Sequence, residues 1–407
     1  MKKYILLVSL FFLIFSCGEE IPEYAEIINV DINTQKVSYK KVKLKGVVSL
    51  ENFESERFKY LSFAKISLFL PPGTQIDENT ATIKEINDVT YQEKGVSPNI
   101  RYTIQDNTLI PYTLNDQILV TLHYNLRNAF DFFKSLGLNP ESGANGKPYG
   151  QIKVFYRLKF EIPNENNLKD TIKDNAMYYP LLNSLAFFEQ KQLKHLALVV
   201  NPMVVTHEFA HSIFAYLAEG ILDENTVFMD LVPKNCDDIH QDFYKSAMNE
   251  GFSDYWAAVK EGSTDLFYLS VTKHEIQADK DPVFDRSLEN NKILTSNMLV
   301  TSRDEEKCQN ETKEKSYYWA GTVWASSLWE IRKTLGIENF DKLVLKSYLC
   351  LYSEFNLNKS NITPALPGNC LVKTLKENNL SSEKINKVCS VLKKRFSIIQ
   401  GEFNECN

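Results

Sequence analysis

The sequence predicts an α+β fold, in which a β-rich N-terminal part precedes a mainly helical C-terminal part. Residues 27–115 are dominated by segments that alternate in polarity or are rich in β-branched residues, such as VSYKKVKLKGVVSL and NIRYTIQ. From about residue 201 onward, apolar residues recur with helical spacing. The chain has 407 residues, which is long enough for two or three domains with a large core.

The composition excludes several classes of protein. Apolar residues make up 43% of the chain and charged residues 24%, which is typical of a folded protein and not of a disordered or collagen-like one. The net charge is -6 and no basic patch stands out, so the sequence predicts no nucleic-acid partner. The only long apolar stretch is at the N-terminus, so no internal segment is expected to span a membrane.

The N-terminus has the pattern of a secretory signal peptide over residues 1–16: two lysines, an apolar stretch too short for an ordinary membrane span, and a small residue. The following IFSC sequence resembles the lipobox of bacterial lipoproteins. The resemblance implies cleavage before Cys17 and a lipid on that residue, which would attach the protein to a membrane. In lipoproteins with such a lipobox, a residue other than aspartate after the cysteine, here Gly18, implies the outer membrane or cell surface. The alternative is a soluble secreted protein with an incidental Cys17.

Six cysteines remain if Cys17 is lipidated, an even number that suits an oxidising compartment. They are Cys236, Cys308, Cys350, Cys370, Cys389 and Cys406. No CxxC pair occurs, so a cysteine zinc site is not expected. Four of the six lie within 350–406, so we expect this segment to be cross-linked within itself, although free buried thiols are an alternative. The spacing of apolar residues predicts two amphipathic helices over 338–407.

Between the β-rich segment and the helical part, the pattern changes twice. Residues 118–136 have helical spacing, with Lys134 near the end and Gly137 as a stop signal. Residues 151–188 return to a strand-like pattern. No internal repeat is evident.

A buried helix is predicted over residues 201–220. Asn201 is a suitable N-cap, Pro202 suits the first helical position, and Gly220 suits the C-terminal cap. The body of this segment is apolar almost all round, which indicates burial on every side.

This helix carries the sequence HEFAH. Because His207 and His211 are four residues apart, their side chains share one helix face and can meet one divalent ion. Glu208 lies beside them and can act as a general base toward water at the metal. The alternative is a pair of core histidines with a buried glutamate. That alternative is unfavourable, because burying three polar side chains without a purpose costs several kcal/mol.

A second helix supplies a candidate for the third ligand. Glu250 and Asp254 are four residues apart on a helix predicted over 246–261, which ends before Gly262. Glu250 can ligate the metal, and Asp254 can accept a hydrogen bond from a ligating histidine, which fixes the tautomer of that histidine. A solvated acidic face is the alternative, but the surrounding residues are mostly apolar.

The segment NEGFSD over 249–254 resembles the NExxSD motif of thermolysin-like and fungalysin-like zinc metallopeptidases, the gluzincins. The zinc ligands that this resemblance implies are His207, His211 and Glu250. It also implies that Glu208 is the catalytic base and that Asp254 supports a ligand. The resemblance extends over about residues 118–336 and implies a thermolysin-like core, with a mixed β-sheet lobe and a helical lobe.

Weaker matches add three further residues. Asn175 in NAMYY resembles the asparagine of the family's edge strand, which binds substrate backbone, and Arg286 in RSL resembles an arginine that contacts a substrate carbonyl. The segment 321–330 resembles a family helix that is preceded by an oxyanion-stabilising histidine. Here that position holds tyrosine, so Tyr318, or Tyr317 if the register differs by one, is expected to donate this hydrogen bond. The alternative is that both are ordinary half-buried aromatics.

The sequence therefore predicts an exported, lipid-anchored zinc metalloendopeptidase that acts on proteins or peptides. The predicted parts are a signal peptide (1–16), a tether (17–26), a β-rich domain (27–115), the metallopeptidase core (116–336) and a helical, disulfide-linked segment (337–407). One alternative is an inactive, metallopeptidase-like surface lipoprotein that binds peptides. Another is an adhesion protein in which the β-rich domain is the functional part.

Overall fold

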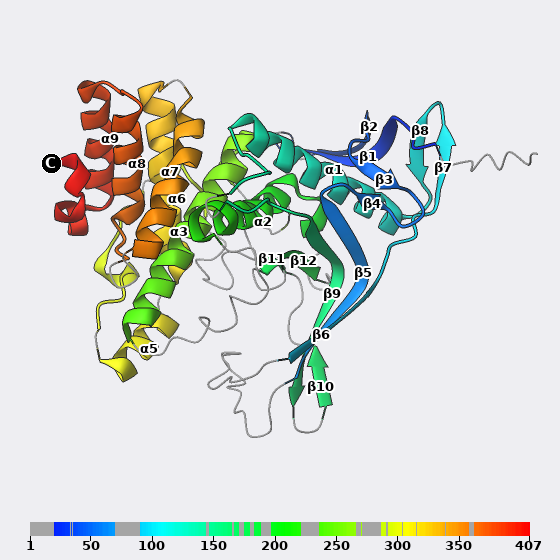
Figure 1. Cartoon of the computed structure of the whole chain (residues 1–407), viewed down its shortest axis with the longest axis horizontal. Helices are drawn as coiled ribbons and strands as arrows, with labels where there is room; N and C mark the ends of the chain where they lie inside the picture. Colours follow the sequence, from blue (N-terminus) through cyan, green and yellow to red (C-terminus); the bar gives the residue numbers. More distant parts are fainter. Residues whose placement is uncertain are drawn as a thin grey trace, which may run out of the picture.

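The computed structural model has an α+β fold, as the sequence predicts (Figure 1). It describes residues 20–32, 34, 36–69, 90–143, 146–164, 167–170, 175–179, 183–188, 197–220, 236–265, 270, 286–289, 292–302, 304–314, 316–337, 339–357 and 362–407. The predicted signal peptide and the predicted lipidation site at Cys17 lie outside these residues. No helix among the described residues is long and apolar enough to cross a membrane.

The strands form one large mixed sheet and smaller sheets. They are β1 (Tyr24–Asp31), β2 (Lys36–Lys43), β3 (Val47–Ser49), β4 (Glu54–Ser55), β5 (Phe58–Phe69), β6 (Thr90–Val96), β7 (Tyr102–Gln105), β8 (Thr108–Pro111), β9 (Ile152–Asn164), β10 (Asn167–Asp170), β11 (Ala176–Tyr179) and β12 (Ser184–Phe188). The large sheet has the order β11-β12-β9-β5-β6, with β10 paired to β9. A second sheet has the order β2-β1-β8-β7, and β3 pairs with β4.

The large sheet crosses the predicted boundary between the β-rich domain and the core. Strand β5 pairs in parallel with β9, with Phe58 opposite Ile152, and β9 pairs in parallel with β12. Strands from the predicted 27–115 domain and from the predicted 116–336 core therefore share one sheet. This pairing joins residues about a hundred positions apart, which a local sequence pattern does not reveal.

The helices include those predicted over 118–136, 201–220 and 246–261. They are α1 (Leu114–Ser135), α2 (Pro202–Phe214), which continues as a π-helical turn (Ala215–Glu219), α3 (Cys236–Glu261), α5 (Glu305–Glu314), α6 (Tyr317–Leu335), α7 (Phe340–Leu357), α8 (Leu366–Glu377) and α9 (Ser382–Arg395). Short 3-10 turns lie at Leu198–Val200, Ser296–Met298, Ser397–Glu402 and Asn404–Cys406. In Figure 1, α2 and α3 lie between the strands and the C-terminal helices. The expectation of two helices over 338–407 is wrong, because the described part of this segment contains α7, α8 and α9.

Helix α1 packs against the second sheet through side-chain bonds to a strand backbone. Gln117 Nε2 donates to the Glu26 carbonyl at 2.6 Å, and the Ile28 N–H donates to Thr121 Oγ1 at 3.0 Å. These bonds satisfy backbone groups of β1 where β8 no longer pairs with it. The helix begins after Thr113, whose side chain accepts from the N–H of Asp116.

Three disulfides link the described cysteines. They are Cys236–Cys308, Cys350–Cys370 and Cys389–Cys406. The last two confirm the prediction that the C-terminal segment is cross-linked within itself. The three bonds together indicate folding in an oxidising or extracellular environment.

Candidate metal centre

Helix α2 forms as its capping residues predict. Asn201 Oδ1 accepts from the N–H of Met203 at 3.0 Å, and Pro202 occupies the first position. The helix passes into the π-helical turn and ends at Gly220, which has the left-handed φ of 68°. The packing of the apolar residues around it leaves the motif side chains buried, with His207 2%, Glu208 6% and His211 8% exposed.

The structure brings the three predicted metal ligands together. The Nε2 atoms of His207 and His211 are 3.0 Å apart. Glu250 on α3 places Oε2 3.3 Å from Nε2 of His207 and Oε1 3.7 Å from Nε2 of His211. The three side chains are buried, and their ligand atoms lie within 4.8 Å of one another, so this group could hold a metal ion.

Asp254 occupies the supporting position that the sequence predicts. Its Oδ1 lies 3.0 Å from Nδ1 of His207, and its side chain is fully buried. An ionised carboxylate only accepts hydrogen bonds, so Nδ1 of His207 carries the proton in this contact.

His211 has a corresponding support that the sequence analysis missed. Its Nδ1 lies 2.8 Å from Oδ1 of Asn249 and 3.1 Å from Oγ of Ser253. Both residues belong to the NEGFSD segment and flank Glu250 on the same helix. Their spacing of one before and three after Glu250 is the signal that could have identified them.

These contacts determine which way the imidazole lone pairs point. When Nδ1 of each ring donates to its oxygen partner, each Nε2 atom is left with a lone pair. The two lone pairs and the Glu250 carboxylate then converge on a shared point. Three electron-rich groups at this separation repel one another, and a cation between them relieves the repulsion.

Without a metal ion, the surrounding side chains favour the protonated form of the His207 ring and the neutral form of the His211 ring. Burial lowers the pKa of His207, and Arg286 acts in the same direction, but hydrogen bonds to Asp254 and Glu250 outweigh both and raise this pKa to about 9. Burial lowers the pKa of His211 to about 4, so this ring is neutral at pH 7. Metal binding therefore has to displace a proton from His207.

Arg286 joins the two carboxylates of the centre. It is 3% exposed, and its Nε donates to Asp254 Oδ2 at 2.9 Å. Its Nη2 donates to Asp254 Oδ1 at 2.7 Å and to Glu250 Oε2 at 2.6 Å. This charge lowers the pKa of Glu250 against the opposing effect of burial, so Glu250 stays ionised. Its contact with a substrate carbonyl stays a prediction.

Glu208, next to His207 on α2, has a different electrostatic environment. Burial raises the pKa of its carboxyl, while His207, Arg286 and a backbone hydrogen bond from Tyr178 oppose this effect, and the resulting pKa is about 7. A carboxyl with this pKa can both take up and release a proton near neutral pH. The bond from Tyr178 also brings strand β11 beside the centre.

Strand β11 carries the predicted substrate-binding asparagine. Asn175 lies just before the first residue of the strand and is exposed. Its side-chain Oδ1 accepts a hydrogen bond from the N–H of Ala176 at 2.9 Å. Among the described strands, β11 is at the end of the large sheet and pairs only with β12. The role of Asn175 toward a substrate stays a prediction.

Tyr317 and Tyr318 lie at the start of α6, beside the centre. The guanidinium carbon of Arg286 lies 4.7 Å from the ring centroid of Tyr318, and the Tyr317 hydroxyl lies 3.4 Å from the Tyr318 hydroxyl. Burial and the nearby Glu250 charge raise the pKa of Tyr318, so its hydroxyl remains a hydrogen-bond donor.

Two glycines allow α6 to approach α3 beside Glu250. A Cβ on Gly251 would collide with the carbonyl of Gly321, and a Cβ on Gly321 would lie 2.8 Å from the carbonyl of Ala247 and 3.2 Å from Cβ of Glu250. Larger residues would push the helices apart. Neither the role of Gly251 nor this close contact has a local signal in the sequence, because both depend on tertiary structure.

No family model matches the chain, and no curated protein matches it. The function therefore has to be argued from the residues of this chain and their geometry.

Proposed function

We propose that this protein is a zinc-dependent metalloendopeptidase with a thermolysin-like core. The observation that carries the proposal is the convergence of two imidazole lone pairs and one carboxylate beside a buried glutamate whose pKa is about 7. A structural metal site does not require that additional glutamate, whereas a hydrolytic site requires a group that moves a proton.

The donor set fits zinc. His207, His211 and Glu250 supply two nitrogens and one carboxylate, which are ligands that zinc accepts in sites with an open position. When bound, zinc polarises a carbonyl and makes water more acidic. Asp254 and Asn249 orient the two rings, and Arg286 keeps Glu250 ionised, so the protein holds the ligands ready for the ion.

The side chains around the ligands have distinct tasks in the proposed reaction. Glu208 takes a proton from the attacking water and gives it to the leaving amine, since its pKa near 7 allows both transfers. Tyr318 donates its hydroxyl hydrogen to the oxyanion that forms from the peptide carbonyl. We propose Tyr318 for this task because Arg286 holds its ring beside Glu250.

Strand β11 suits the binding of an extended peptide. Its position at the end of the large sheet, next to Glu208, allows a substrate to add as a further strand with its scissile bond near Glu208. Asn175 would fix the register of that strand through its amide. The substrate class is therefore an unfolded or flexible polypeptide.

The central experiment compares three full-length variants with the wild type for metal content and for cleavage of an unfolded protein. We expect Glu208→Gln to keep its zinc and to lose about 10²–10⁴-fold in cleavage rate, because it removes only the proton-transfer group. Glu250→Ala should lose both zinc and activity. Glu377→Gln, an exposed change on α8, is the control and should match the wild type.

One result would favour the alternative of an inactive peptide-binding protein. If the zinc-loaded wild type binds an extended peptide but cleaves none of a broad peptide library, the proposed hydrolysis is wrong. The replacement of the family's histidine by Tyr318 is the observation that makes this outcome worth testing.

We further propose that the protein is exported and anchored through a lipid on Cys17. The three disulfides favour an oxidising compartment, and the lipobox-like sequence lies just ahead of the described chain. Fatty-acid labelling of the wild type, but not of Cys17→Ser, would support lipidation, as would release of the variant from membranes. Unlabelled wild-type protein in the soluble fraction would contradict it.

A further inference from the structure

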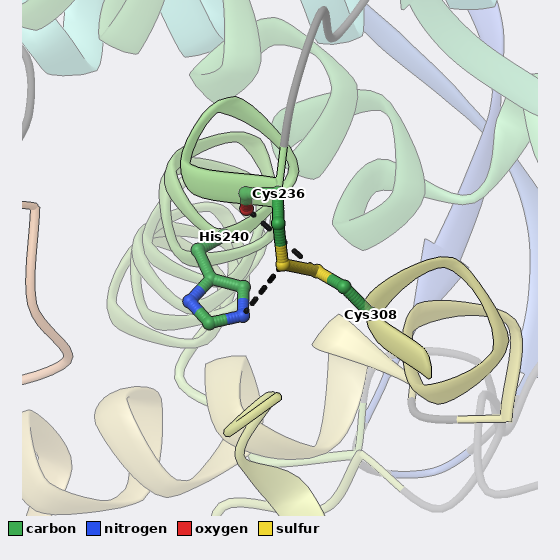
Figure 2. A group of neighbouring side chains, drawn as sticks. All are labelled: Cys236, His240 and Cys308. Carbon is green, nitrogen blue, oxygen red and sulfur yellow. Dashed lines mark hydrogen bonds between the residues drawn. A yellow bond between two sulfur atoms is a disulfide. The ribbon is translucent and has the colours of Figure 1, made fainter. Parts of the chain in front are cut away.

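A second group of metal-ligating side chains lies at the start of α3, away from the metal centre. The Cys236–Cys308 disulfide joins the first residue of α3 to α5, and Nε2 of His240 lies 3.7 Å from Sγ of Cys236 (Figure 2). The potential ligand atoms of these three residues lie within 4.8 Å of one another. Both cysteines are buried, and His240 is half-buried, so the group has contact with solvent through the imidazole.

The spacing of this group is the same as that of the metal centre. Cys236 and His240 are four residues apart on one helix, as are His207 and His211, so both pairs project from one helix face. In each group a different helix supplies the third ligand, here Cys308 from α5.

The imidazole distinguishes this disulfide from the other two. Among the described residues, neither Cys350–Cys370 nor Cys389–Cys406 has a third metal-ligating side chain within 4.8 Å. Those two bonds cross-link the C-terminal helices without such a neighbour. A cross-link alone therefore does not account for the position of His240.

We propose that Cys236, His240 and Cys308 form a second metal site in the reduced protein, and that the disulfide is the oxidised, metal-free state of that site. A dithiol reductant donates two electrons to the sulfur–sulfur bond and becomes a disulfide itself, which leaves two thiols on the protein. Binding of a zinc ion then releases the two thiol protons, and the neutral ring of His240 binds through Nε2.

The ligand types select the class of metal. Two thiolates and one imidazole favour zinc over calcium or magnesium, which prefer oxygen ligands. Three protein ligands also leave one position of a tetrahedral ion for water or for a ligand from outside the chain. In either redox state α3 stays attached to α5, first by sulfur and then by metal.

The test uses the full-length His207→Ala/His211→Ala double variant, which lacks the first site, with Co²⁺ as the probe. We expect the oxidised protein to show no thiolate-to-cobalt charge-transfer band and the reduced protein to show one band at one equivalent of Co²⁺. Adding Cys236→Ser should abolish the band although the four C-terminal thiols are still present. Adding His240→Ala should weaken Co²⁺ binding at least ~10-fold while keeping both thiols.

Zinc stoichiometry of the unmodified protein provides a second measurement that does not depend on these variants. We expect one tightly bound zinc in the oxidised protein and one more after reduction, with circular dichroism verifying that the fold is retained. Equal affinity of the His240→Ala and parent proteins, or no additional zinc after reduction, would overturn the proposal. These outcomes do not depend on whether the first site is catalytic.

Discussion

Buried histidines in two regions of the molecule have opposite surroundings. His123 on α1 is 1% exposed; its Nδ1 lies 2.9 Å from the Tyr60 hydroxyl and its Nε2 lies 2.8 Å from the carbonyl of Lys45. Each ring nitrogen therefore has a partner of complementary polarity within the protein. At the candidate metal centre, Nδ1 of each ring is partnered but the two Nε2 atoms face each other, an arrangement that a proton on His207 or a metal ion can bridge. Burial alone does not identify a ligand, whereas the direction of the lone pairs does.

The largest expected effect is a difference in zinc affinity between a substitution at the metal centre and a substitution at His123. His211→Ala removes a ligand and should weaken zinc binding by more than ~100-fold, because loss of even a supporting residue costs about 10–100-fold. His123→Gln should leave zinc binding unchanged. Competition with a chelator measures both affinities. If His123→Gln weakens binding as much as His211→Ala does, the comparison is wrong.

The next effect is a pH dependence of stability that arises from His123. Burial lowers the pKa of this ring to about 4, with Arg127 acting in the same direction against the Lys45 hydrogen bond. The unfolded chain binds a proton below about pH 6.5, whereas the folded ring stays neutral down to about pH 4. The stability is therefore complete above about pH 6.5 and falls as the pH drops toward 4, by about 3 kcal/mol.

Urea unfolding of wild type and His123→Gln between pH 4.5 and 7.5 measures this contribution. The amide can replace both hydrogen bonds but does not titrate, so the free energy of unfolding of the variant should rise relative to that of the wild type as the pH falls. A difference that stays constant across this range would show that the buried ring does not stay neutral.

A smaller effect is expected at the helix crossing beside Glu250. Gly321→Ala places a methyl group against the Ala247 carbonyl and should lower the free energy of unfolding by about 2 kcal/mol. Gly401→Ala is the matched control, since a Cβ there meets no heavy atom within 4 Å. Equal stability of the two variants in urea would mean that α3 and α6 separate without cost.

The smallest expected effect concerns the support of His211. Asn249→Ala should weaken zinc binding about 10-fold, because the ring loses an acceptor that fixes its tautomer. Asn249→Asp retains an oxygen acceptor and should bind zinc more tightly than Asn249→Ala does. The reverse order in chelator competition would contradict the role of Asn249 in orienting the lone pair.

Local patterns predicted the parts of the site that lie on single helices. Asn201 and Gly220 marked the ends of α2 and its π-helical turn, and the spacing of His207 and His211 predicted that both rings share one helix face. Glu250 was the candidate third ligand on a second helix, a role that the resemblance of NEGFSD to a family motif also implied, and the structure brings the three together. Asp254 was expected to support one of the ligating histidines, and in the structure that histidine is His207. These features depend on helical periodicity, which is visible in the sequence.

Features that depend on distant contacts were not predictable in this way. The Gly251–Gly321 approach requires knowing that α3 crosses α6, and the pairing of β5 with β9 requires knowing which strands meet. The position of Arg286 on two protein carboxylates likewise depends on the folded chain. None of these has a periodic signature along the sequence.

The placement of β5 between β9 and β6 has a practical consequence for anyone who wants the metal centre in isolation. A shortened polypeptide that starts at residue 116 would lack β5, an interior strand of the large sheet. The unpaired edge of β9 would then be exposed and prone to aggregation. Its failure to hydrolyse a peptide would then report misfolding and would say nothing about chemistry. Single substitutions in the full-length chain therefore test the chemistry of the metal centre more reliably than a truncation does.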